Sequence, residues 1–210
     1  MQEKIYSILN QISEFIYENY QEDIQEAFEY FWEEEKPEDI LHGMMLDMGE
    51  LNFDDWLTVD YRNPYGEGFL ELYEKYSELS EDEKKILTAL KESMISLYEV
   101  EDVSNNSIRL KDLLRDKRLE FISERLSRLK NGDLFATRFI TIDNEIFMGK
   151  CIYPFHSFQK DEVLKYLDMQ FKRYLKNENP QGDIESFLKE ASSVFNTVWL
   201  TVMGDKRRNE

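Results

Sequence analysis

One stretch, residues 97–155, constrains the fold more than any other part of the chain, because its pattern is that of short β-strands. Ile108 and Leu110 alternate with two basic residues at a period of two, as in a half-buried strand. Turn residues such as Asn131-Gly132-Asp133 separate the runs. The runs cover residues 97–103, 108–111, 119–122, 134–142 and 146–153. We expect about five antiparallel strands that curl into a small, partly open barrel, which limits exposed edges.

Helical patterns flank this stretch on both sides. In residues 3–20 apolar side chains recur every three or four positions, as on one face of an amphipathic helix. We expect a further helix over residues 38–47, with Gly49 as its C-cap. Ser80, followed three residues later by a glutamate, matches a capping box and predicts a helix that runs to Ser96.

These patterns predict an α+β fold. It has a helical N-terminal region, a small five-stranded antiparallel barrel-like sheet and two C-terminal helices, the second of them capped by Asp183. We expect three regions in the chain. They are an acidic helical region over residues 1–93, an antiparallel β region over residues 94–155, and a C-terminal helical pair, packed on the rest, over residues 156–204.

Residue content argues against several classes of function. Cys151 is the single cysteine, so neither an intramolecular disulfide nor a cysteine-rich zinc site can form. His42 and His156 are the two histidines, and neither lies at a metal-ligand spacing. No phosphate-binding loop or nucleophile motif occurs, and no apolar run reaches the length of a membrane span. We therefore expect no cofactor, no bound metal, no membrane segment and a cytoplasmic location.

Charge is distributed unevenly along the chain, whose formal net charge is −18. Residues 1–60 hold 17 acidic and 2 basic residues, whereas residues 109–138 hold 9 basic and 5 acidic residues. We define a candidate binding face in the strand region. It consists of Arg109, Lys111, Arg115, Lys117, Arg118 and Arg138. These cations either meet the acidic N-terminal helices of the same chain or bind an anionic partner. The overall charge disfavours nucleic acid, so a protein is the expected partner, with nucleic acid left open as an alternative at the local basic face.

A second group of charged residues follows the N-terminal helices. Asp54, Asp55 and Asp60 could form a carboxylate cluster that binds a divalent cation or performs acid–base chemistry. The alternative is a structural lock beside Trp56, in which Asp60 pairs with Arg62 or with an arginine of the strand region and fastens the helices to the sheet. We favour the lock.

The order of several short motifs across residues 53–153 resembles uncharacterised bacterial proteins that often contain a SEC-C zinc motif. The motifs are Phe53-x-Asp55-Trp56, Asp60-Tyr61-Arg62, Phe69-Leu70, Leu79-Ser80-x-x-Glu83, Ser96-Leu97-Tyr98-Glu99-Val100, Leu110-x-Asp112-Leu113-Leu114, Gly132-Asp133 and Ala136-x-Arg138. The zinc motif needs several cysteines and this chain has one, so a metal-dependent adaptor role is not implied. The resemblance bears on the fold rather than on the activity.

Two classes of function remain. The first is a non-catalytic interaction or adaptor protein with an acidic helical face and a basic strand-region face. The second is a carboxylate-based hydrolase, with or without a divalent metal, that uses Asp54, Asp55 and Asp60. We favour the first because familiar catalytic motifs are missing and the charge is segregated.

Overall fold

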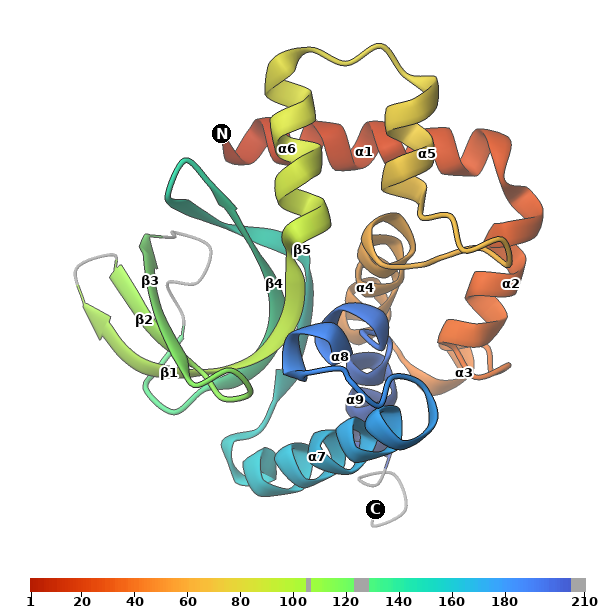
Figure 1. The fold of residues 1–210 in the computed structure, drawn as a ribbon. Helices are drawn as coiled ribbons and strands as arrows, with labels where there is room; N and C mark the ends of the chain where they lie inside the picture. The colour runs from red at the N-terminus through yellow and green to blue at the C-terminus, as the bar shows by residue number, and fades with distance from the viewer. Residues whose placement is uncertain (105–106, 123–128, 205–210) are drawn as a thin grey trace. The chain divides into compact units, whose positions relative to one another are not determined.

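The computed structural model describes residues 1–104, 107–122 and 129–204, and it confirms the predicted α+β fold (Figure 1). The helices before the sheet are α1 (Gln2–Asn19), α2 (Gln21–Phe31), α3 (Pro37–Ile40), α4 (Met44–Val59), α5 (Phe69–Tyr76) and α6 (Glu81–Glu92). The strands are β1 (Met94–Ser104), β2 (Ser107–Asp112), β3 (Lys117–Ile122), β4 (Leu134–Ile142) and β5 (Glu145–Phe155). The 3-10 turn η1 (Ser157–Gln159), α7 (Lys160–Asn177), α8 (Ile184–Glu190) and α9 (Val194–Gly204) follow.

Contacts divide the chain into two compact units. Unit 1 contains residues 1–93 and 139–151, and unit 2 contains residues 94–138 and the described part of residues 152–210. Helices α1 to α6 therefore belong to unit 1, while β1 to β3 and α7 to α9 belong to unit 2. The three consecutive regions expected from the sequence remain a prediction.

The sheet is antiparallel, with the strand order β3-β2-β1-β4-β5. Ser104 pairs with Ser107 across the predicted β1–β2 hairpin, whose two tip residues lie outside the described part of the chain. The register between β1 and β2 shifts at residues 100–102, as at a β-bulge, which increases twist. Among the described strands, β3 and β5 are the two edges. The sheet is therefore open, and "barrel-like" describes only its curl.

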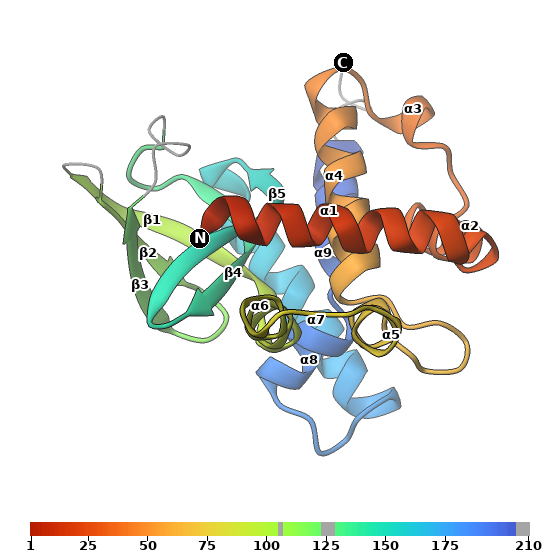
Figure 2. The ribbon, with the colours of Figure 1, turned by 90° about the horizontal axis from the view of Figure 1, so that it is seen from above.

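Unit 1 is built around α1, which lies across α4 (Figure 2) and also contacts α2, α5 and α6. The predicted apolar stripe of α1 is confirmed, because Ile5, Ile12 and Ile16 have no exposed surface. Aromatic rings fill the space between α2 and α4. Phe31 lies 5.1 Å from Trp56 and 5.3 Å from Phe53, measured between ring centroids. Edge and tilted contacts of this kind add to the free energy of burial.

A polar stripe of α1 covers part of the edge strand β5. The side chains of Gln2 and Tyr6 both donate to the carbonyl oxygen of Met148, at 2.8 Å and 3.3 Å. One turn further along, Asn10 accepts a hydrogen bond of 2.7 Å from the Lys150 ammonium. The spacing of four residues places these side chains on one helix face. Their hydrogen bonds engage the carbonyl group of Met148 and the side chain of Lys150, groups of an edge strand that could otherwise bind another chain.

Two helix boundaries expected from the sequence are wrong. Gly49 does not cap a helix but lies buried inside α4, where its backbone passes close to Trp32 and Leu41. Ser80 caps α6 with the full capping box, but α6 ends at Glu92 and Ser96 belongs to β1. The chain is already extended one residue after the end of α6, since the next residue has φ −72° and ψ 156°.

The C-terminal helices follow the prediction in part. Asp183 caps α8 as predicted, since its carboxylate accepts a hydrogen bond of 2.8 Å from the backbone N–H of Ser186. The predicted final helix is divided into α8 and α9, because Ala191 leaves helical geometry at φ −119° and ψ 30°. No helix in the described residues is long and apolar enough to cross a bilayer.

Candidate functional site

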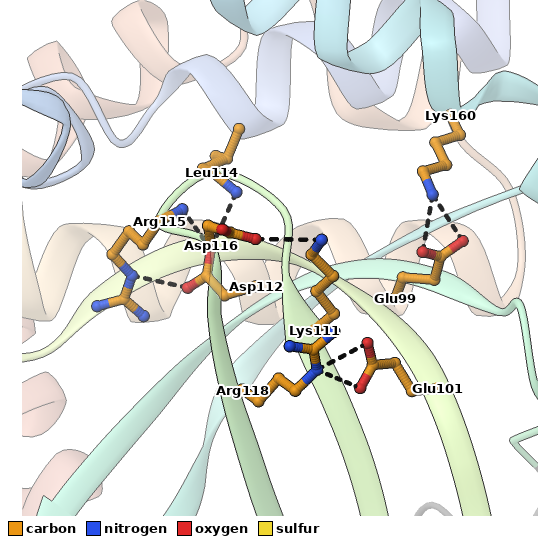
Figure 3. Close-up of polar contacts among 9 residues, drawn as sticks. All are labelled: Glu99, Glu101, Lys111, Asp112, Leu114, Arg115, Asp116, Arg118 and Lys160. Carbon is orange, nitrogen blue, oxygen red and sulfur yellow. Dashed lines mark hydrogen bonds and ion pairs between the residues drawn. The ribbon is translucent and has the colours of Figure 1, made fainter.

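The basic residues of the strand region lie beside carboxylates of unit 2 (Figure 3). The nitrogen–oxygen pairs are Lys111–Asp116 at 3.1 Å, Lys117–Glu185 at 2.6 Å, Arg118–Glu101 at 2.8 Å and Arg109–Glu120 at 3.9 Å. None of these carboxylates belongs to residues 1–60, the acidic segment that was one of the two partners expected from the sequence. The exposed cations of the candidate binding face therefore have local counter-charges.

Arg115 belongs to a buried polar centre. Its Nε donates to Asp112 at 2.7 Å and its Nη2 donates to the hydroxyl of Tyr98 at 3.1 Å. Asp112 has no exposed surface and also accepts hydrogen bonds from Ser96 Oγ and from the backbone N–H groups of Leu114 and Arg115. Burial lowers the pKa of the Arg115 guanidinium, but Tyr98 and Asp112 raise it by more, so the net direction is upward. This centre ties β1 to the turn after β2.

Sequence reasoning did not single out Asp112 as a structural lock. The signal was an aspartate at the end of a strand and just before a turn, where its carboxylate can accept the next backbone N–H groups. Arg138 has no exposed surface in β4, so it is not part of an exposed face. Arg125 and Arg128 lie outside the described residues.

The three aspartates near α4 have different surroundings. Asp54 accepts a hydrogen bond of 2.6 Å from Ser13 Oγ and lies 3.6 Å from the Lys150 ammonium. Asp55 is 1% exposed, and Asp60 is the half-buried residue that ends α4. In residues 1–104, 107–122 and 129–204, no cluster of three or more histidine, cysteine, aspartate or glutamate side chains has an arrangement that could hold a metal ion.

Two residues of the candidate structural lock have different surroundings: Trp56 lies in the core, whereas Arg62 lies on the surface. Trp56 is 5% exposed and its ring lies 5.3 Å from that of Tyr61. Arg62 is exposed. Its Nη2 lies 3.3 Å from Glu71 and its Nη1 donates to the carbonyl oxygen of Gly66 at 3.1 Å. These contacts of Arg62 hold the loop between α4 and α5.

Charge separates between the two units. Unit 1 contains 27 acidic and 8 basic residues, a net charge of −19. Unit 2, counted over residues 94–138 and 152–210, contains 17 acidic and 18 basic residues, a net charge of +1. Unit 1 therefore accounts for the net negative charge of the chain.

We name the exposed side chains of residues 14–47 in unit 1 the acidic helical surface. This segment contains twelve acidic residues, eleven of them exposed, and one basic residue. Exposed aromatic residues lie among them: Tyr17 is 43% exposed, Phe28 36% and Tyr30 64%. Burial raises the pKa of the Tyr61 hydroxyl to about 12, and the nearby carboxylates of Glu26 and Asp23 add to the rise.

Comparison with known proteins places the chain in a family but not in a pathway. A family model matches residues 7–188, which is most of the chain, and its description is a family of unknown function, DUF7986. No curated protein and no solved structure matches the chain. The family match gives no link to the SEC-C-motif proteins that the short motifs resemble. The chain belongs to DUF7986, a family of unknown function.

Proposed function

We propose that this protein is a non-catalytic interaction module that binds a basic protein segment through its acidic helical surface. The observation that supports this most is the separation of charge, with −19 on unit 1 and +1 on unit 2. The basic residues of the candidate binding face are matched by nearby carboxylates, which makes that face the weaker binding candidate.

The physical basis is electrostatic attraction combined with aromatic contact. A surface with eleven exposed acidic residues and one basic residue raises the local concentration of a polycation and speeds its association. Tyr17, Phe28 and Tyr30 add the kind of side chain that supplies most of the binding free energy at protein interfaces. Such binding weakens as salt screens the charges.

The hydrolase alternative requires Asp54, Asp55 and Asp60 to converge on a cleft. Asp54 is instead engaged by Ser13 and Lys150, and Asp55 is 1% exposed. These contacts favour the interaction module over carboxylate chemistry.

The proposal is tested by titrating the full chain against a fluorescent peptide of about ten residues in which lysine and glycine alternate, and following anisotropy at low salt. We expect saturable binding that is lost at about 500 mM NaCl, where the Debye length is only a few ångströms. The same peptide with glutamate in place of lysine should not bind. No binding of the lysine peptide at low salt would overturn the proposal.

Matched charge variants locate the surface. Replacing Glu18, Glu22 and Glu26 with glutamine removes three exposed charges from the acidic helical surface. Replacing Asp161 with asparagine, and Glu162 and Glu178 with glutamine, removes three exposed charges from α7 and its C-cap in unit 2. We expect the first variant to weaken binding about tenfold and the second to have a much smaller effect. Equal losses would mean that the net charge alone matters, which contradicts the assigned surface.

A further inference from the structure

The loop between α4 and α5, residues 62–68, is held by several internal hydrogen bonds. The backbone N–H of Asn63 donates to Glu67 at 3.0 Å, and the N–H of Gly66 donates to Asn63 at 2.8 Å. The Asn63 side-chain oxygen accepts from the N–H groups of Tyr65 and Glu67, both at 3.0 Å. Asn63 itself is only 7% exposed. The loop is therefore organised around one buried amide.

Arg62 provides a second set of restraints at the base of the loop. Its guanidinium donates to the carbonyl oxygen of Gly66 and lies 3.3 Å from the Glu71 carboxylate, while its backbone forms an antiparallel bridge with Gly68. Gly66 has φ +79°, a left-handed conformation that glycine adopts without strain. These restraints reduce the conformational freedom of the loop before any partner binds.

This rigid loop presents Tyr65, which is 88% exposed, the highest value among the large hydrophobic side chains of the described residues. A tyrosine on an ordered loop binds with little further loss of conformational entropy, because it has two side-chain torsions and its backbone is already held. Such a residue contributes nothing to the core. Its geometry is that of an anchor for a partner.

The net charge of unit 1 favours a basic partner. Unit 1 carries −19, Glu67 lies two residues from Tyr65, and the cation of the loop, Arg62, is already paired with Glu71. A cation already lies over a tyrosine ring in the same unit, since the Lys75 ammonium is 4.9 Å from the centroid of Tyr76. Arginine stacks on aromatic faces better than lysine, because its guanidinium is planar and more weakly hydrated.

We propose that Tyr65 is the anchor residue for the basic partner segment, and that it packs against an arginine side chain of that segment. This inference rests on the proposed function and adds a residue and a side-chain preference to it. Pure electrostatic attraction treats arginine and lysine peptides of equal charge alike, whereas stacking on Tyr65 favours the arginine peptide.

The test compares two labelled peptides of about ten residues, one alternating arginine with glycine and the other lysine with glycine, titrated against the full chain. We expect the arginine peptide to bind more tightly. Tyr65→Ala should weaken arginine-peptide binding about 3- to 30-fold and remove the preference over lysine, while Tyr65→Phe, which keeps the ring, should retain both. Because Tyr65 is 88% exposed, the melting temperature should not change.

Tyr76→Ala is the matched control, because Tyr76 is 62% exposed in the same unit but the Lys75 ammonium already lies 4.9 Å from the centroid of its ring. It should leave the arginine preference intact. If the peptides bind but Tyr65→Ala changes neither affinity nor preference, the anchor is wrong and the proposed function stands. If neither peptide binds the wild-type chain, both proposals fail. An effect of Tyr76→Ala equal to that of Tyr65→Ala would also overturn the assignment.

Discussion

Asp112 is the centre of one buried hydrogen-bond network in unit 2. Its carboxylate has no exposed surface and accepts hydrogen bonds from Ser96, Leu114 and Arg115. A buried charge is tolerated when a counter-charge and hydrogen bonds replace the lost water. The same requirement makes the pair vulnerable, because removal of one partner leaves the other buried without compensation.

Asp112→Ala should therefore lower the free energy of unfolding by about 3 kcal/mol, since it leaves the Arg115 guanidinium without its counter-charge and two backbone N–H groups without their acceptor. Asp116→Asn is the control, because Asp116 pairs with Lys111 but its side chain is 86% exposed. That change should cost less than about 1 kcal/mol, since asparagine tolerates the left-handed backbone found there. Urea unfolding followed by circular dichroism measures both, and equal losses would contradict the special role of Asp112.

At the level of elements, tertiary packing explains why α4 has a glycine, Gly49, in its interior. A Cβ built on Gly49 would lie 2.7 Å from Trp32 Cη2 and 2.8 Å from Leu41 Cδ1. The segment that precedes α4 therefore packs against the bare backbone of the helix. Glycine weakens a helix interior, and here close approach compensates for that weakness.

Gly49→Ala has two opposing effects. Higher helix propensity stabilises α4 by about 1 kcal/mol, whereas overpacking against Trp32 and Leu41 costs about 1–3 kcal/mol. We expect net destabilisation of about 1 kcal/mol in urea unfolding. Repeating the change in a Leu41→Ala background removes one of the two clashes, so the cost of Gly49→Ala should fall. A stabilising effect of the same size in both backgrounds would show that propensity alone decides.

For the whole molecule, the main physical feature is the separation of charge between the units. Unit 1 holds 27 acidic and 8 basic residues, so repulsion among its carboxylates opposes its folding. Unit 2 is close to neutral at +1. The two units should therefore respond differently to ionic strength.

Raising NaCl from about 10 mM to about 150 mM shortens the Debye length from about 30 Å to about 8 Å and should stabilise unit 1 selectively. Hydrogen exchange resolved by peptide should show slower exchange in α1 and α4, with little change in β1 to β3. The strands of unit 2 thus serve as an internal control. Equal slowing in both sets would indicate a general salt effect rather than relief of local repulsion.

The sequence alone determined the class and order of most elements, because periodicity is a local property of the chain. Short β-type runs separated by turn residues predicted the five strands to within a few residues, and apolar spacing predicted α1 and its buried stripe. Turn and cap chemistry is equally local, so Ser80 and Asp183 were identified as caps without knowledge of the fold. The strongly acidic N-terminal region also follows from residue content alone.

Only the tertiary structure decided which groups meet. A basic run can pair with any acidic segment, and proximity in space selected Glu101, Asp116, Glu120 and Glu185 as partners for its exposed cations. The roles of Gly49 and Asp112 depend on neighbours distant in sequence or on burial, and the prominence of Tyr65 depends on how its loop is held. Periodicity and spacing cannot specify such contacts, because they arise when segments separated along the chain pack together.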